Sequence, residues 1–280
     1  MDVPQHAQPI IDLIRKVWKN VKESRVSYLD ENKLKGLKIT LTTLDFDSGK
    51  PGDNGEIFIR PFPYSKMLQL INRNRPWLNP YGCPSILPVD EALDNDAQAR
   101  NFFNVAQGYL SLNSDVSASG VIDETVWEIQ VPSKQDCLSR WDDYARWNVP
   151  NYLVNNDSSK PHVIAFAFVA DQALLRDGLL SLSEVQMTLL LTGRRLLRKE
   201  CRHKQIVPVT MICVSGYQAR ITQIYIDAAE EHKIKSIVEV KAEMRYDNLP
   251  LFGIQETGEM AAWISHDPPE DFDSENRLGT

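Results

Sequence analysis

The pattern of hydrophobic and polar residues is most informative between positions 161 and 244. An apolar run at 162–170 is followed by a helical pattern at 181–204, where Leu and Val residues recur every three or four positions. Apolar residues then gather in three strand-like segments, at 207–214, 220–226 and 234–241. This order predicts a sheet built from the three late strands, joined by the strand at 162–170, with the helix packed against it.

The helix predicted at 181–204 carries signals at both ends. Ser181 and Glu184 have the spacing of a capping box, in which each side chain satisfies a free backbone N–H group at the start of a helix. The far end is strongly basic between Arg194 and Lys204. The backbone dipole favours cations at the C-terminal end of a helix, so a solvated basic face accounts for much of this cluster.

The first half of the chain contains further amphipathic segments. Apolar residues between Ile10 and Val21 form one stripe at helical spacing, which predicts a first helix. Residues 36–46 alternate as a half-buried strand, and a turn-rich segment joins them to a second strand in a predicted hairpin. The other predicted elements are a strand at 56–60, helices at 64–74 and 95–112, and a strand at 123–131.

Four aromatic residues concentrate in the middle of the chain. A capping-box pattern begins at Ser133, so we predict a helix that carries Trp141, Tyr144 and Trp147 after the strand that contains Trp127. Aromatic side chains dominate core burial, so we expect these residues in the core, with Trp141 as the anchor of its helix. If the protein binds a small apolar ligand, this cluster is the expected place.

A polar stretch at 148–160 is the expected domain boundary. We predict an N-terminal half at 1–150, with a hairpin and helices, and a C-terminal half at 151–264, with the order β-α-β-β-β. Residues 265–280 are acidic, contain two prolines and have little to bury, which predicts a disordered tail. Because helices and strands do not alternate regularly, the pattern predicts an α+β fold with a mixed or antiparallel sheet.

Composition limits the class of protein. The chain has 280 residues, of which 42% are hydrophobic and 25% charged, as in ordinary globular proteins. Its net charge of −7 argues against a surface that neutralises nucleic-acid phosphates over a long footprint. No apolar run could span a bilayer, and the first ten residues lack the pattern of a secretory signal. The four cysteines form no CxxC pair, which favours buried thiols and a cytosolic or nuclear location.

The last two predicted strands carry a candidate site. Asp227 ends one strand, and Glu239 and Lys241 lie two positions apart in the next, so they project from the same face. A helix and three strands with an Asp and then Glu-x-Lys resemble the PD-(D/E)xK nuclease-like superfamily. The resemblance implies that Asp227 and Glu239 bind Mg²⁺ or Mn²⁺ and that Lys241 is the catalytic base or orients the attacking water.

The register of this hairpin decides between two arrangements. A turn about Lys233 would place Asp227 opposite Glu239, with about 5 Å between the Cβ atoms. A turn about Glu231 would place Gln223 opposite Glu239 and leave the two carboxylates about 13 Å apart, too far for one ion. In the alternative without a metal, these residues form the solvated side of an edge hairpin.

A second resemblance concerns the segment at 207–227. Its strand, its Ser-Gly-Tyr-Gln-Ala loop and the following Arg220-Ile-x-Gln223 strand resemble part of uncharacterised fungal proteins, which implies an intracellular fungal setting and no activity. Two functions stay open. One is a non-catalytic binding or accessory protein, with a protein partner or a small apolar ligand and no cofactor. The other is a divalent-metal-dependent nuclease-like protein, or a degenerate descendant of one, whose basic segment at 194–204 approaches phosphates.

Overall fold

The computed structural model shows a mixed sheet with helices packed on it. It describes residues 8–45, 48–53, 58, 97, 126–133, 136–141, 145–169, 175–176, 178–204, 206–215, 218–227 and 233–243; at 219, 227 and 233–243 it describes the backbone only. The helices are α1 (Gln8–Glu23), α2 (Glu31–Gly36), α5 (Leu182–Leu197) and the short 3-10 helix η3 (Lys199–Cys201). The predicted α+β class is confirmed.

Eight strands form the main sheet, in the spatial order β2-β10-β9-β8-β6-β5-β3, with β4 also paired to β5. They are β2 (Ile39–Thr43), β3 (Trp127–Gln130), β4 (Ser139–Trp141), β5 (Arg146–Asn155), β6 (Val163–Val169), β8 (Val209–Ser215), β9 (Gln218–Asp227) and β10 (Lys233–Glu243). The β2–β10 and β6–β8 pairs are parallel, and the other pairs are antiparallel. A separate antiparallel pair joins β1 (Tyr28–Leu29) to β7 (Leu180–Ser181).

The elements predicted in the second half are present in the predicted order. β6, α5, β8, β9 and β10 follow one another along the chain, and the last three form an antiparallel meander. The capping box is also confirmed, because Ser181 Oγ accepts a hydrogen bond from the Glu184 backbone N–H at 3.1 Å. In return, the Ser181 backbone N–H donates to Glu184 Oε2 at 2.8 Å. In the first half, α1 spans the whole segment predicted as helix, and β2 lies within the segment predicted as strand.

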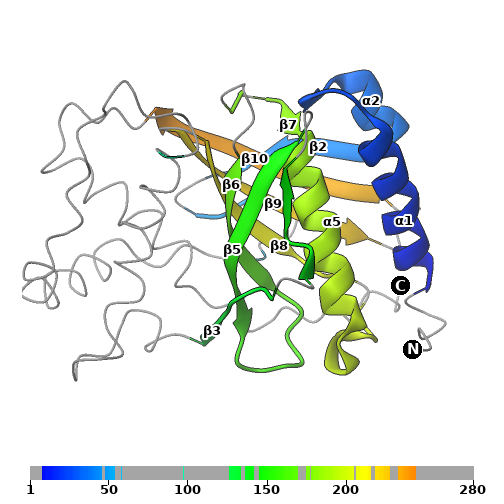
Figure 1. Ribbon diagram of the computed structural model, residues 1–280, viewed down its shortest axis with the longest axis vertical. Coiled ribbons are helices and arrows are strands. Elements are labelled where there is room, and N and C mark those ends of the chain that lie inside the picture. The colour runs from blue at the N-terminus through cyan, green and yellow to red at the C-terminus, as the bar shows by residue number, and fades with distance from the viewer. Residues whose placement is uncertain are drawn as a thin grey trace, which may run out of the picture.

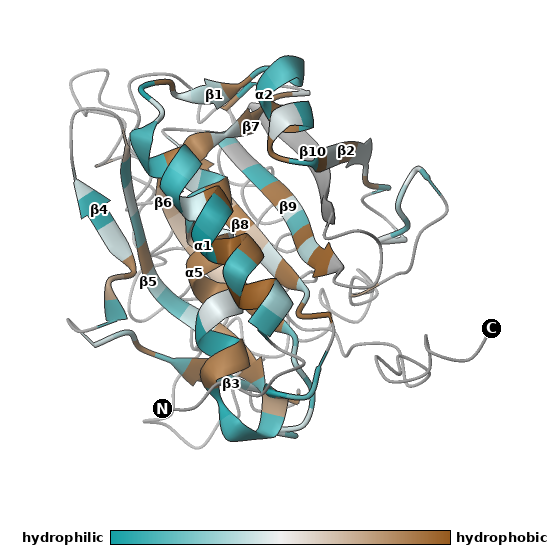
Figure 2. Cartoon of the chain, turned by 90° about the vertical axis from the view of Figure 1, so that its right-hand side faces the viewer, coloured by the Kyte–Doolittle hydropathy of each residue, from teal (hydrophilic) through white to brown (hydrophobic). Residues whose placement is uncertain are grey.

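α5 packs against one face of the sheet, and α1 packs on α5 from outside (Figure 1). Eleven of the 16 residues of α5 are buried, because the sheet and α1 cover different sides of it. α1 is amphipathic, and its buried positions include Ile10, Val17 and Val21. Figure 2 looks onto α1, with α5 and the sheet behind it. This layering makes α5 the centre of the helical layer.

The central strands β6 and β8 are buried at every position. In β6 the residues that belong to the core beside α5 include the small Ala165 and Ala167. Residues alternate between the two faces of a strand, so the bulky Phe166 and Phe168 lie on the other face. Burial on both faces explains why β6 reads as a continuous apolar run.

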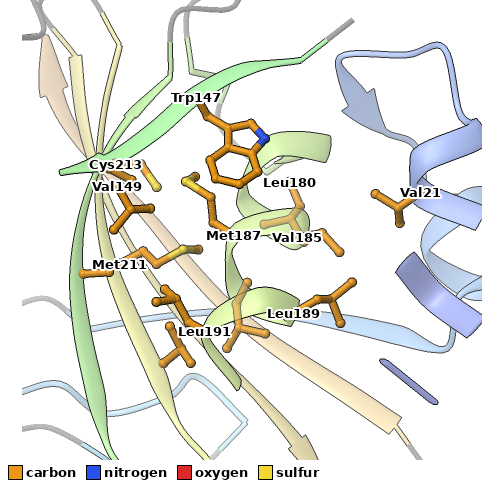
Figure 3. Close-up of a cluster of buried hydrophobic side chains, with 14 of the residues drawn as sticks. Val21, Trp147, Val149, Leu180, Val185, Met187, Leu189, Leu191, Met211 and Cys213 are labelled. Carbon is orange, nitrogen blue, oxygen red and sulfur yellow. The ribbon is translucent and has the colours of Figure 1, made fainter. Parts of the chain in front are cut away.

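Side chains from the sheet and the helices meet in one core beside α5 (Figure 3). Trp147 of β5 is among its largest members and is 1% exposed. Its indole Nε1–H donates to the side-chain oxygen of Gln186 in α5 at 2.9 Å. The core therefore joins β5 to α5 by apolar packing and by a buried hydrogen bond.

The prediction of a helix after Ser133 is wrong. The residues there form β4 and β5, which pair in antiparallel fashion with Trp141 opposite Arg146. Trp141 was expected to anchor the core, but it is 50% exposed, because β4 lies at an edge of the sheet. Aromatic residues also favour strands, and pairing with β6 overrides the helical spacing.

The expected domain boundary falls inside a strand. β5 runs from Arg146 to Asn155, so the polar segment at 148–160 is largely sheet and not a connection. The register shifts between Asn148 and Asn151, which marks a β-bulge. β2 from the first half also pairs with β10 from the second, so both halves contribute strands to one sheet.

Several predicted elements lie outside the described residues. These are most of the strand at 56–60 and of the helix at 95–112, and all of the helix at 64–74 and of the tail at 265–280. The described partner of β2 in the sheet is β10, whereas most of its predicted hairpin partner is not described. Within the described ranges, no helix has the length and apolar character needed to cross a lipid bilayer.

Candidate functional site

A polar cleft lies between the C-terminal half of α5 and the edge of the sheet formed by β3 and β5. Its volume is about 260 Å³. The cleft is lined by Glu128, Gln130, Tyr152, Val154, Asn155, Asn156, Ser158, Val163, Leu191, Arg194, Arg195, Arg198 and Glu200. Most of these residues are polar or charged, in contrast to the apolar core beside α5.

The pairing of β3 with β5 builds one wall of the cleft. Glu128 lies opposite Val154, and Gln130 lies opposite Tyr152, so all four residues are on one face of the sheet. Val154 and Tyr152 belong to the core that packs on α5, which identifies this face as the helix side. The alternation of β3 therefore presents Glu128 and Gln130 to the cleft and puts Trp127 on the opposite face.

Glu128 is held in place along its own strand. The Gln130 side-chain amide donates to Glu128 Oε1 at 2.8 Å. Both residues face the cleft, and Glu128 is exposed at its rim. The wall formed by β3 thus offers an oriented carboxylate whose second oxygen can accept further hydrogen bonds.

Arginines of α5 form the opposite wall. Arg194 Nη1 lies 2.7 Å from Asp136 Oδ1, and its guanidinium carbon lies 5.9 Å from the centre of the Tyr152 ring. The hydrogen bond from Arg194, and further bonds within the turn at Ser133, hold the pKa of the Asp136 carboxyl below its ordinary value. Arg194 is therefore a neutralised and fixed part of the cleft wall.

The other two arginines of this wall are less engaged. Arg195 Nη2 donates to the backbone oxygen of Lys160 at 2.6 Å, while its buried Nε has no hydrogen-bond partner among the described residues. Arg198 is exposed at the rim, and we find no ion pair of its side chain in the described part of the chain. Arg198 is the residue that directly follows α5, in an extended conformation, and it lines the cleft together with Arg194.

The arrangement favours binding of a small polar molecule. Guanidinium groups donate several hydrogen bonds in a fixed planar geometry that fits carboxylate and phosphate oxygens. The cleft floor contains Leu191 and Val163, which are buried and exclude water from one side. Charged hydrogen bonds against such a floor are stronger than in open solvent.

His162 lies beside the cleft, at the residue before Val163, and is fully buried. Burial lowers the pKa of this imidazole from 6.5 to about 3, and the nearby charges of Lys160 and Arg195 act in the same direction. The folded protein therefore holds His162 neutral at physiological pH. This side chain is a poor proton carrier for chemistry near neutrality.

Burial of neutral His162 predicts a specific loss of stability in acid. The unfolded chain binds a proton at His162 below pH 6.5, whereas the folded chain binds it only near pH 3. The free energy of unfolding therefore falls as the pH drops below 6.5, and at pH 4.5 it is about 2.7 kcal/mol lower than above pH 6.5. Urea unfolding of wild type and His162→Gln between pH 7.5 and 4.5 measures this loss.

The His162→Gln variant is expected to have a shallower acid dependence than wild type, by about 1.4 kcal/mol per pH unit between pH 6 and 4. The matched control is His203→Gln, which makes the same substitution at an exposed histidine. Parallel profiles for wild type and His162→Gln would show that His162 is protonated in the folded state.

A second polar cluster lies at the opposite end of α5 and is fully enclosed. Arg220 Nε lies 3.0 Å from Glu184 Oε1, and Nη2 lies 3.0 Å from Glu184 Oε2, with both side chains 0% exposed. Thr222 Oγ1 donates to Glu184 Oε1 at 2.9 Å. Arg220 Nη1 also donates to the backbone oxygens of Arg176 and Leu179 at 2.9 and 2.7 Å. The opposite charges of Arg220 and Glu184 are paired, so this cluster joins α5, β9 and the loop that precedes α5.

The residues predicted as a metal site are not brought together. In the hairpin of β9 and β10, Asp227 pairs with Lys233, whereas Glu239 pairs with Ile221. The two acidic positions are thus six residues apart along the strands, roughly 20 Å. Lys241 pairs with Ala219, further along the same hairpin. Neither of the two registers considered from the sequence is adopted, and the described residues contain no group of three or more side chains placed to hold a metal ion.

The four aromatic residues expected in one core cluster are separated. Trp127 and Trp147 are both buried. Trp127 of β3 pairs with Asn155 at one end of β5, whereas Trp147 lies near the other end of β5 and pairs with Val169 of β6. Trp141 is half exposed, and residue 144 lies outside the described residues. They do not form a shared cage for an apolar ligand.

The cysteines follow the prediction in part. Cys201 and Cys213 are buried, and this burial raises the pKa of both thiols. Cys201 Sγ donates to the backbone oxygen of Ser158 at 3.3 Å, so the basic helix end does not activate it as a nucleophile. Cys137 is exposed, contrary to prediction, and Cys83 lies outside the described residues.

One feature of the sequence indicated where the cleft lies. The basic end of the helix was visible, but the helix dipole accounts equally well for cations there. Glu128 and Gln130 could not be assigned to the same site, because their strand meets α5 only through its pairing with β5. No protein-family model, no curated protein and no solved structure matches this chain.

Proposed function

We propose that the chain is a non-catalytic binding protein whose cleft beside α5 holds a small polar molecule with a negatively charged group. The observation that carries this proposal is the convergence of Arg194, Arg195 and Arg198 on one wall of the cleft. Arg198 supports it most directly, since no described residue neutralises its guanidinium group. An arginine in a concave site is a typical receptor for carboxylate or phosphate oxygens.

The size of the cleft supports a small ligand. Its volume of about 260 Å³ is below the roughly 300–1,000 Å³ of sites for drug-sized molecules. The lining side chains include Tyr152 and Asn155, which are largely buried and offer hydrogen-bonding groups to a ligand. A polar metabolite therefore fits this cleft better than the apolar ligand considered from the sequence.

The binding proposal is tested by titration with simple anions. The purified protein is titrated calorimetrically with acetate, succinate, inorganic phosphate and pooled L-amino acids at low salt. We expect at least one of these probes to bind, with an affinity that falls as the salt concentration rises. Arg198→Gln is expected to weaken binding about tenfold or more, because it removes a charge-assisted hydrogen bond.

The matched control is Arg202→Gln. Arg202 lies four positions further along the chain and donates to the backbone oxygen of Leu197, but it does not line the cleft. This variant should bind each probe as wild type does. The proposal is overturned if none of the probes binds, or if Arg198→Gln and Arg202→Gln weaken binding equally.

A further inference from the structure

We propose that the ligand of the cleft is a zwitterion of amino-acid size, with its carboxylate on Arg198 and its ammonium group on Glu128. This inference rests on the proposed binding function and specifies its ligand. It starts from the fact that the lining of the cleft contains side chains of both charges. Arg195 lies in α5 and Arg198 directly follows it, whereas Glu128 comes from β3 and Glu200 from η3.

The balance of charge in the cleft selects against a simple anion. Arg194 is neutralised by Asp136, at 2.7 Å. Among the described residues of the lining, two cations, Arg195 and Arg198, and two carboxylates, Glu128 and Glu200, then remain. A dianion such as phosphate would be repelled by carboxylates close to it. A molecule with no net charge and two separated charged ends matches a lining that contains both charges.

The carboxylate of Glu128 is prepared for a cationic or donor group. Its Oε1 atom accepts the hydrogen bond from Gln130, which limits the motion of the side chain. The second oxygen remains for a ligand, and an ammonium group supplies three donors at a single point. A carboxylate that already accepts a hydrogen bond loses less side-chain freedom when the ligand binds, so the cost of ordering offsets less of its contact with the ligand.

The carboxylate of the ligand has a corresponding site just after the C-terminal end of α5. Arg198 is exposed at the rim, and a guanidinium group can bind both oxygens of a carboxylate in parallel hydrogen bonds. The volume of about 260 Å³ leaves room for a compact side chain between these walls.

The experiment compares one amino acid with two of its analogues. The twenty L-amino acids are titrated in pools and then singly, and the tightest is compared with its des-amino carboxylic acid and its methyl ester. The des-amino acid lacks the ammonium group, and the methyl ester lacks the carboxylate. We expect the amino acid to bind about tenfold tighter than either analogue, which is the usual effect of one charge-assisted contact.

Two variants assign the contacts to residues. Glu128→Gln should weaken binding of the amino acid about tenfold and leave binding of the des-amino acid unchanged. Arg198→Gln should weaken binding of both the amino acid and the des-amino acid, while binding of the methyl ester should not change. Glu128 is exposed, so its substitution should leave the melting temperature close to that of wild type, which a thermal melt verifies.

The outcomes separate this inference from the binding function. If the des-amino acid or inorganic phosphate binds as tightly as the best amino acid, the zwitterion inference is overturned and the binding function stands. The same holds if Glu128→Gln weakens the amino acid and its des-amino analogue equally. If neither amino acids nor simple anions bind, the binding function itself is overturned.

Discussion

Trp147→Ala is expected to lower the free energy of unfolding by about 3–5 kcal/mol, while Trp141→Ala lowers it by less than about 1 kcal/mol. The difference comes from burial, because Trp147 is 1% exposed in the core beside α5 and Trp141 is 50% exposed at the sheet edge. Urea unfolding monitored by far-ultraviolet circular dichroism measures both values. Trp141 is thus the matched control, with the same residue type in the adjacent strand.

A third variant divides the effect of Trp147 into two parts. Trp147→Phe keeps most of the apolar volume but removes the hydrogen bond to Gln186, whose side chain is fully buried. The Gln186 oxygen then has no donor, which costs about 1–3 kcal/mol. Equal losses for Trp147→Ala and Trp141→Ala would contradict the packing of β5 against α5.

Arg220→Met is expected to destabilise the protein by about 3–5 kcal/mol. Glu184 would then keep a buried carboxylate without its cation, and the carbonyl groups of Arg176 and Leu179 would lose their donor. Removing one member of a buried ion pair is costly because the remaining charge is neither solvated nor paired. Urea unfolding gives the free-energy change.

A double-mutant cycle separates the ion pair from the rest of the network. Glu184→Gln removes the charge but keeps a side chain that can still complete the capping box with Ser181. The double variant with Arg220→Met contains neither charge, so it should lose less stability than the sum of the two single variants, by about 1–3 kcal/mol. Additive losses would show that the two charges do not interact in the folded protein.

Arg198→Gln, on the exposed rim of the cleft, is the control for loss of an arginine. Its free energy of unfolding should be within about 0.5 kcal/mol of the wild-type value.

Local signals were sufficient for much of the second half. The continuous apolar run of β6, the capping box of α5 and the three strands that follow are encoded by residues close together in the chain. Burial on both faces makes β6 and β8 almost wholly apolar, so their pattern does not depend on knowing their neighbours.

The segment of β4 and β5 could not be predicted in this way. Its aromatic residues occur at spacings that fit a helix, and asparagines at 148, 151 and 155 give β5 the composition of a loop. The decisive interactions are with β6 and β3, which no local window contains. Tertiary pairing therefore overrides local preference here, as it often does for strands.

The candidate site was less predictable than the fold. Glu128 and Arg198 are 70 positions apart and meet only because β3 extends the sheet beneath α5. The short motif at Asp227 and Glu239 was visible in the sequence, but its meaning depended on strand register. The register of β9 and β10 separates the two residues along the hairpin.

The parallel pairing of β2 with β10 has a consequence for how the chain folds. Ile39 pairs with Ile234, about 195 residues later, and contacts of such long range slow folding because a large loop must close first. At about 5–20 residues per second, β2 is synthesised roughly 10–40 s before its partner strand. The strands from β5 to β9 and α5 form one continuous segment that can assemble without it. We therefore expect β2 to join the sheet last and to remain unpaired, and accessible to chaperones, until β10 has been synthesised.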